Sequence, residues 1–210
     1  MKEFIILMAD IVGSRKGEQA QLMADFKELV DTINLEKKES FLSPLTITLG
    51  DEFQGVLINV AAAVDVVLAL EEKLIADNRA FKLRYVITEG LIETPINKEI
   101  AYGMLGDGLT RARGYLEHLK KDDMRFFIWL KNQPQKNALN NLFVAVQDIV
   151  DDWNAERDYY LVTSFLAHKD YKRVAMELQK ERSLMWKREK TLKINSYFAL
   201  KEVANYLTHV

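Results

Sequence analysis

The sequence predicts an α+β fold, in which a ferredoxin-like βαββαβ sheet domain is followed by a small all-α helical domain. Two observations indicate this. Up to Leu130, short runs typical of strands alternate with amphipathic helical segments, and beyond it the apolar residues recur only at helical spacing. The chain has 210 residues, of which 49% are hydrophobic and 29% charged, as in ordinary globular proteins. We therefore expect one domain at residues 1–133 and a second at residues 134–210.

The expected first domain begins with Phe4–Ala9, an apolar run without polar alternation, which is typical of a strand buried on both faces. Gln19–Lys38 carries apolar residues at helical spacing and predicts an amphipathic helix. Pro44 is expected to open a second strand, Leu45–Leu49, whose Thr and Ile residues suit a sheet. Phe53–Ile58 is expected to return beside it as the second strand of a hairpin.

The remaining elements of this domain complete the sheet. Val60–Leu74 is rich in Ala and apolar on most sides, which predicts a well-buried helix, and Lys82–Thr88 predicts a strand. Gly103–Gly108 is a glycine-dense loop that leads into a helix ending at Leu119, and Arg125–Leu130 is the last expected strand. The order βαββαβ, with these additions, predicts a sheet with its helices on one face.

The second domain is expected to contain helices only. Lys131–Asn141 is rich in Lys, Asn and Gln and contains Pro134, a composition typical of a domain boundary. The helices expected after it are Asn140–Trp153, Asp158–Ala167, Tyr171–Leu178 and Leu184–Leu207, the last with a break near Asn195.

Composition excludes several classes of protein. The chain has no cysteine, so it can form neither disulfides nor thiolate metal sites. Its net charge of -2 gives no overall attraction to nucleic acid or membrane. No stretch approaches the roughly 18 apolar residues of a membrane span, and the apolar run at the N-terminus is too short for a signal peptide. We expect a cytoplasmic protein with no membrane partner.

Two carboxylates stand where strands end. Asp10 follows the first strand and Asp51 lies in the turn of the hairpin, and these strands are neighbours in a βαββαβ sheet. Mg²⁺ and similar cations bind carboxylate oxygens together with the phosphates of a ligand. Glu52 either contributes to such a site or faces water. From position alone, an Asp after a strand is more often a turn former or a helix cap.

Three strings of residues together resemble the SatD family: Asp10-Ile11-Val12-Gly13-Ser14-Arg15, Gly50-Asp51-Glu52-Phe53-Gln54-Gly55, and Gly106-Asp107-Gly108 with Ala112-Arg113. The same segments are similar to the metal-binding and nucleotide-binding segments of class III nucleotide cyclases. The resemblance implies a nucleotide-cyclase-like first domain and a C-terminal part resembling a helix-turn-helix. It covers residues 3–130 well and the remainder more loosely.

The resemblance also implies roles for single residues. A divalent cation, Mg²⁺ or Mn²⁺, would be held by Asp10, Asp51 and the main-chain carbonyl of Ile11, and it would carry a nucleoside triphosphate. The residues around it would bind the nucleotide in a homodimer, because sites of this kind are usually shared across a two-fold interface. The implied nucleotide-binding residues are Ile11, Val12, Gly13, Ser14, Arg15, Gly106, Asp107 and Gly108.

The catalytic half of the cyclase pattern is altered. Where cyclases have an Asn and an Arg that stabilise the transition state, this chain has Thr110 and Gly114. Losing such a donor typically costs about 10²–10³ in rate, and Thr110, Arg111 and Arg113 are the remaining catalytic candidates. We therefore expect a regulatory protein that binds a metal–nucleotide complex. The alternatives are an active nucleotidyl cyclase (a phosphorus–oxygen lyase) or nucleotidyltransferase, and a homodimeric interaction module without ligands.

The segment from Tyr171 to Arg188 has the spacing of a helix-turn-helix, with Leu178 and Met185 as its expected core. The usual turn glycine is replaced by Gln179. A basic second helix suits entry into the major groove of DNA beside its phosphates. A helical appendage that packs on the first domain or forms a dimer is the alternative. The residues expected to face DNA are Ser183, Trp186, Lys187 and Lys190.

Overall fold

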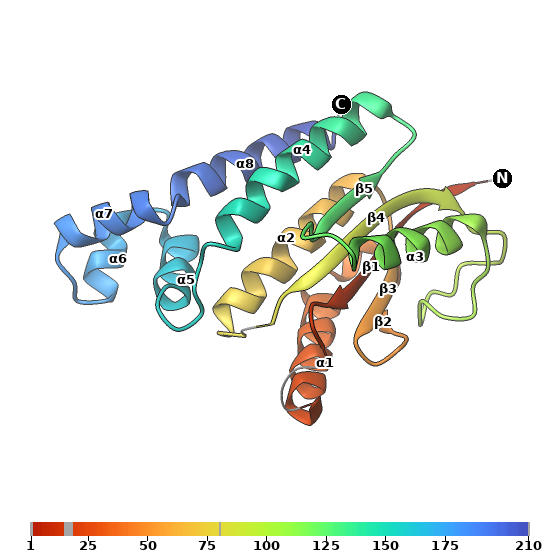
Figure 1. The fold of residues 1–210 in the computed structure, drawn as a ribbon, viewed down its shortest axis with the longest axis horizontal. Coiled ribbons are helices and arrows are strands. Elements are labelled where there is room, and N and C mark those ends of the chain that lie inside the picture. Colours follow the sequence, from red (N-terminus) through yellow and green to blue (C-terminus); the bar gives the residue numbers. More distant parts are fainter. Residues whose placement is uncertain (1, 15–18, 80, 210) are drawn as a thin grey trace.

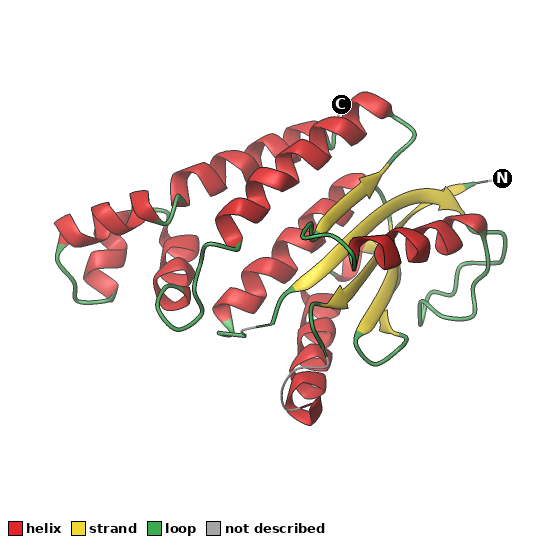
Figure 2. Ribbon diagram, in the orientation of Figure 1, coloured by secondary structure: helices red, strands yellow, loops and turns green. Residues whose placement is uncertain are grey.

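The computed structural model describes residues 2–14, 19–79 and 81–209 and confirms the α+β fold class (Figure 1; Figure 2). One five-stranded sheet is covered by helices, and an all-helical part follows it. The strands are β1 (Glu3–Ile11), β2 (Phe41–Ile47), β3 (Glu52–Leu57), β4 (Leu83–Leu91) and β5 (Phe126–Trp129). The helices between the strands are α1 (Gln19–Glu36), the single 3₁₀ turn η1 (Lys38–Ser40), α2 (Val60–Ala76) and α3 (Asp107–Leu119).

The sheet has the strand order β2-β3-β1-β4-β5. β1 lies between β3 and β4 and runs antiparallel to both, β2 pairs antiparallel with β3, and β5 pairs parallel with β4. The units β1-α1-β2 and β3-α2-β4 therefore each leave a gap that a strand of the other unit fills, which agrees with the expected βαββαβ order. The first strand and the hairpin are neighbours, as predicted.

Both faces of the sheet are covered, so the expectation of helices on one face only is wrong. Ile5, Leu7 and Ala9 of β1 point into the core beneath α1 and α2. Ile6 and Met8, on the other face, pack with residues of α3. The prediction that the first strand is buried on both faces is confirmed, and α3 supplies the second layer (Figure 1).

The edge strand β2 begins at Phe41, earlier than the predicted start at Leu45. Pro44 lies inside this strand, between Ser43 and Thr46, where the pairing with β3 shifts register. An edge strand tolerates proline because one row of its N–H groups has no strand partner, and a bulge absorbs the missing donor. Proline therefore marks an irregular edge strand here and not a strand start.

The C-terminal part is helical, as predicted, but it begins earlier than the composition indicated. Asn132 caps α4, since its side chain accepts a hydrogen bond from the N–H of Gln135, and Pro134 lies in the first turn. The polar segment expected to mark a domain boundary thus contains the start of a helix. The helices are α4 (Gln133–Val150), α5 (Tyr159–His168), α6 (Tyr171–Glu177), α7 (Arg182–Thr191) and α8 (Ile194–Leu207).

The helical part shares its core with the sheet part. α4 lies beside α8 and packs on β5, while α5 and α8 pack on α2 (Figure 1). The ring of Phe143 in α4 stacks on that of Phe126 in β5, with 5.0 Å between ring centroids. Tyr197 of α8 donates a 3.0 Å hydrogen bond to Glu72 of α2. The break predicted near Asn195 falls at Lys193, whose φ of 54° separates α7 from α8.

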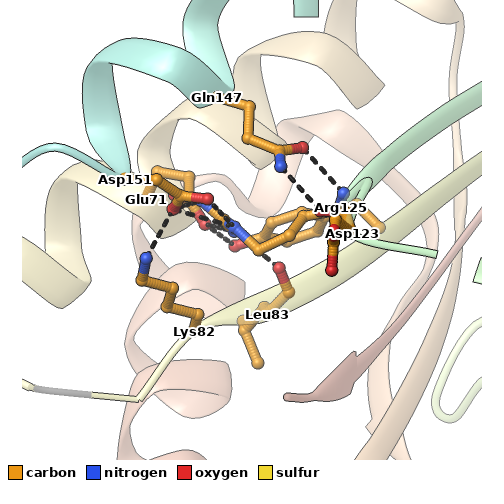
Figure 3. Close-up of polar contacts among 8 residues, drawn as sticks. Glu71, Lys82, Leu83, Asp123, Arg125, Gln147 and Asp151 are labelled. Carbon is orange, nitrogen blue, oxygen red and sulfur yellow. Dashed lines mark hydrogen bonds and ion pairs between the residues drawn. The ribbon is translucent and has the colours of Figure 1, made fainter. Parts of the chain in front are cut away.

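A buried ion-pair network fixes α4 to the sheet (Figure 3). Arg125, at the start of β5, donates to both carboxylate oxygens of Glu71 in α2, at 3.0 and 2.8 Å. The same guanidinium donates to Asp151, which follows α4, at 3.1 Å and to the carbonyl of Leu83 at 2.6 Å. Tyr85 adds a 2.8 Å hydrogen bond to Glu71.

Within the described ranges, no helix is both long and apolar enough to traverse a bilayer.

Candidate functional site

Three charged side chains form a row across adjacent strands on the face that α3 covers. The pairing register places Asp10 of β1 opposite Glu52 of β3 on one side and opposite Arg84 of β4 on the other. One nitrogen of Arg84 lies 3.1 and 3.2 Å from the two carboxylate oxygens of Asp10. Asp10 is only 2% exposed and Glu52 only 6%. Two carboxylates are therefore buried side by side at one end of the sheet.

α3 and the residue that caps its C-terminal end add two cations to this row. The ammonium of Lys120 lies 3.5 Å from Asp10, 3.1 Å from Glu52 and 2.7 Å from Glu117. Arg113, two turns earlier on the same helix, contacts Glu52 at 3.1 Å. Each buried carboxylate is thus shared by two cationic side chains, which offsets the cost of burying its charge.

A cavity of about 300 Å³ opens beside these charges. Its position is fixed by the hairpin turn, because the N–H of Ile11 donates a 3.0 Å hydrogen bond to the carbonyl of Asp51. Ser14 donates a 2.5 Å hydrogen bond to the carboxylate of Asp51. The structure therefore brings together the residues that the sequence implied as metal ligands. The lining residues are Asp10, Ile11, Gly13, Ser14, Asp51, Arg84 and Lys120.

The environment of Asp10 disfavours its charge. Burial raises the pKa of this carboxyl above its usual range, and the charges of Arg84 and Lys120 oppose the rise only in part. For Lys120, burial lowers the pKa, but hydrogen bonds to Glu117 and Glu52 and the charge of Asp10 outweigh it and raise the pKa overall. Lys120 therefore keeps its positive charge at neutral pH. A carboxylate whose ionised form is disfavoured by folding is typical of a functional group.

The oxygen atoms of this site suit a hard divalent cation in their chemistry. Asp10 and Asp51 offer carboxylate oxygens, which Mg²⁺ and Mn²⁺ prefer. Across residues 2–14, 19–79 and 81–209, no group of three or more His, Asp or Glu side chains is arranged to hold a metal by itself. The site thus fits an ion that takes one or two ligands from the protein and the rest from phosphate and water.

The glycine loop before α3 lies at the other end of the sheet. A Cβ atom at Gly108 would lie 2.7 Å from the main chain of Gly90, which pairs with Phe4. Arg84 and Asp10 stand six residues farther along these strands, or about 20 Å at the rise of a strand. Gly106, Asp107 and Gly108 therefore do not line the Asp10 cavity of the same chain.

The other residues implied in nucleotide binding and catalysis lie at one or the other of these two ends of the sheet. The N–H of Val12 is used by the main chain, donating to the carbonyl of Lys82. Arg111 pairs with Asp107 at 2.9 Å and lies over the ring of Trp129, while exposed Thr110 bonds to the carbonyl of Gly106. Of the three catalytic candidates, only Arg113 reaches the charged row. Arg15 lies outside the described residues.

Sequence reasoning missed Arg84 and Lys120 and left Glu52 open. The one available signal is that Arg84 is the only charged residue between Leu83 and Ile87, in a strand otherwise suited to burial. A charged side chain is rarely buried in a strand unless it pairs with an opposite charge. The cross-strand register that supplies Asp10 as this partner is a property of the folded sheet.

A second candidate surface lies on α6 and α7. Gln179 adopts the left-handed conformation with φ of 52°, the conformation that glycine usually supplies in such a turn. Met185 is buried and Leu178 half-buried, as expected of residues between the two helices. The side chains implied for DNA contact, Ser183, Trp186, Lys187 and Lys190, are all exposed.

This surface carries more basic than acidic side chains, although Glu177 and Glu181 are also exposed on it. Arg188 of α7 is held by buried Asp158, and its side chain therefore anchors α7 to the segment before α5. The ammonium of Lys190 lies 3.7 Å from the centroid of the exposed Trp186 ring. Within the part of the chain that the structure describes, six cations of α6, α7 and their turn form no ion pair: Lys172, Arg173, Lys180, Arg182, Lys187 and Lys190.

Comparison with known proteins gives a family. The model of the SatD family matches residues 4–208, and no curated protein matches the chain. A bacterial light-regulated adenylyl cyclase is 16% identical, with a TM-score of 0.42 over 60% of this chain and 74% of its own. The adenylyl cyclase CyaB from P. aeruginosa is 15% identical, with a TM-score of 0.41 over 56% and 72%. At this level of similarity neither cyclase supports a conclusion about this chain.

Proposed function

The chain belongs to the SatD family, and we propose that its sheet part is a regulatory module that binds a nucleoside triphosphate together with one divalent cation. The observation that supports this is the mixed charge of the 300 Å³ cavity, which Asp10 and Asp51 line together with Arg84 and Lys120. Carboxylates suit the cation, and the cationic side chains suit the phosphates that accompany it. A site for a metal alone or for an anion alone would need only one of these sets.

Binding without turnover is the reading that the residues favour. Thr110 and Gly114 stand where the cyclase pattern has its transition-state donors, and Gly114 offers no side chain that could donate. Product analysis of any bound nucleotide tests the alternative of an active cyclase or nucleotidyltransferase. A homodimer is part of this proposal, and sedimentation at high protein concentration tests it.

The first prediction is that Mg²⁺ or Mn²⁺ with a nucleoside triphosphate raises the stability of the wild-type protein. At a hundredfold excess over Kd the expected gain is about 2.7 kcal/mol, measured as a thermal shift across the common triphosphates. Asp51→Asn removes the carboxylate that no described cation shares, so it should weaken binding at least about tenfold. Chelation of the metal with EDTA should weaken binding of the triphosphate in the wild type.

The matched control is Asp65→Asn, because Asp65 is exposed on α2 and pairs only with Lys37. It should leave the ligand-induced thermal shift unchanged. Absence of any shift with every triphosphate in the wild type would refute the proposed function. Equal shifts in Asp51→Asn and Asp65→Asn would show that the ligand binds elsewhere.

As a second function, we propose that α7 binds DNA. The supporting observation is the group of cations without ion pairs on α6 and α7, beside the exposed indole of Trp186. Phosphates attract such cations, and an exposed aromatic ring next to them can contact sugar or base. The alternative is that this surface packs on the sheet part. The exposure of Trp186 and Lys187 argues against it.

The second prediction concerns the salt dependence of this binding. The double variant Lys187→Ala/Lys190→Ala should reduce the slope of log K against log [salt] by about two units, since each phosphate contact contributes about 0.9. Fluorescence anisotropy with a short duplex measures this. Lys27→Ala/Lys38→Ala, in α1 and η1 of the sheet part, is the charge-matched control. An unchanged slope in the α7 variant, or no binding at low salt, would assign α7 to protein contacts.

A further inference from the structure

Lys120 occupies a position that a metal ion would otherwise suit. Its ammonium lies between the two buried carboxylates of the row, 3.5 Å from Asp10 and 3.1 Å from Glu52. These carboxylates are held in place by cross-strand pairing and by Arg84 and Arg113. A cation bound between fixed carboxylates is the arrangement by which proteins hold divalent ions. In this chain, a side chain supplies the cation.

The attachment of Lys120 differs from that of its neighbours. Arg84 arises from strand β4 and its side chain is largely buried, whereas the side chain of Lys120 is 33% exposed. Lys120 caps α3 at its C-terminal end, and its flexible four-carbon stem carries a compact charge. It also lines the cavity itself. Of the cations around Asp10, Lys120 is therefore the one able to move within the site.

We propose that Lys120 is a built-in counter-ion, which the divalent cation displaces from Asp10 and which then binds a phosphate of the incoming ligand. This inference rests on the proposed function. The exchange keeps charge balanced, because the cation replaces the ammonium beside Asp10 while the ammonium gains a phosphate. Metal alone must expel Lys120 without offering it a new partner. Metal and nucleotide therefore bind cooperatively, each raising the affinity for the other by the same factor.

The experiment compares Lys120→Met with Lys120→Arg, which keeps the charge, and with Lys121→Met, which removes the neighbouring exposed lysine. Free Mn²⁺ is measured by electron paramagnetic resonance in the absence of nucleotide. Removing a competing positive charge a few ångströms away should tighten Mn²⁺ binding at least about tenfold in Lys120→Met. Lys120→Arg and Lys121→Met should bind Mn²⁺ as weakly as the wild type.

The affinity for nucleotide should change in the opposite direction to the affinity for Mn²⁺. With Mg²⁺ saturating, Lys120→Met should bind the triphosphate that stabilises the wild type about tenfold more weakly, because it lacks the ammonium for the phosphate. Tighter Mn²⁺ binding with weaker nucleotide binding supports the exchange. Unchanged or weaker Mn²⁺ binding in Lys120→Met overturns it, even where the wild type binds nucleotide. Failure of the wild type to bind any triphosphate would instead remove the proposed function.

Discussion

Replacing Arg125 by Met is expected to lower the free energy of unfolding by about 3–5 kcal/mol, since breaking a buried ion pair leaves an uncompensated charge. Arg125 is 5% exposed, and its partner Glu71 is equally buried. The guanidinium donates to Glu71 with two nitrogens and also reaches Asp151 and the carbonyl of Leu83 (Figure 3). No other cation contacts Glu71 within the described part of the chain.

Urea unfolding followed by circular dichroism measures this loss. Lys27→Met is the control, because the Lys27–Asp31 pair is exposed on α1 and should contribute less than about 1 kcal/mol. Adding Glu71→Leu to the Arg125 variant should recover part of the stability, since replacing both partners removes the unpaired charge. A midpoint equal to that of the wild type in Arg125→Met would show that the network contributes little.

The same network bears on the predicted division of the chain. Arg125 joins α2 and β4 of the sheet part to Asp151 of the helical part, and Phe126 stacks on Phe143 across the same boundary. Residues on both sides of position 134 therefore share one apolar core. We expect both parts to unfold in one transition, although composition alone predicts two domains. In the polar segment that indicated the boundary, Asn132 caps α4 and Pro134 lies in its first turn.

The elements of the fold could be predicted because their signals are local. The apolar run of β1, the amphipathic spacing of α1 and the glycine turn at Gly50 each specify one element. The second face of the sheet could not be predicted in this way. Whether α3 covers the same face as α1 depends on the connection through residues 92–106, which has no regular pattern to read.

The candidate site could be predicted in its acidic half only. The sequence places Asp10 near the end of the first strand and Asp51 in the hairpin turn, and the resemblance to the SatD family implies a role for both. Arg84 and Lys120 reach Asp10 through strand register and through the length of α3, neither of which is visible in the sequence. Glu52 was ambiguous for the same reason, since its neighbour on β1 decides whether it faces water or a buried carboxylate. The cations that complete the site therefore appear only in three dimensions.

Gly108→Ala and Gly114→Ala are expected to change stability in opposite directions, although both residues lie in α3. A Cβ atom at Gly108 would lie 2.7 and 2.9 Å from main-chain atoms of Gly90, which must shift to admit it. Such overpacking costs about 1–3 kcal/mol. A Cβ atom at exposed Gly114 meets nothing within 4 Å, so alanine should stabilise the helix by about 0.5–1 kcal/mol. Urea unfolding of both variants measures the difference.

The same pair of variants tests the role of Gly108 at the start of α3. If Gly108 serves close packing against β4, Gly108→Ala displaces α3, which carries Lys120 and Arg113 to Asp10 and Glu52. Ligand binding should then weaken together with stability, and Gly114→Ala should bind as the wild type does. If the glycine loop instead contacts phosphate in a dimer, Gly108→Ala should lose binding while its stability stays within about 0.5 kcal/mol of the wild type. Because α3 spans the sheet from Gly90 to Asp10, we expect the first result: its packing at one end positions the charges at the other.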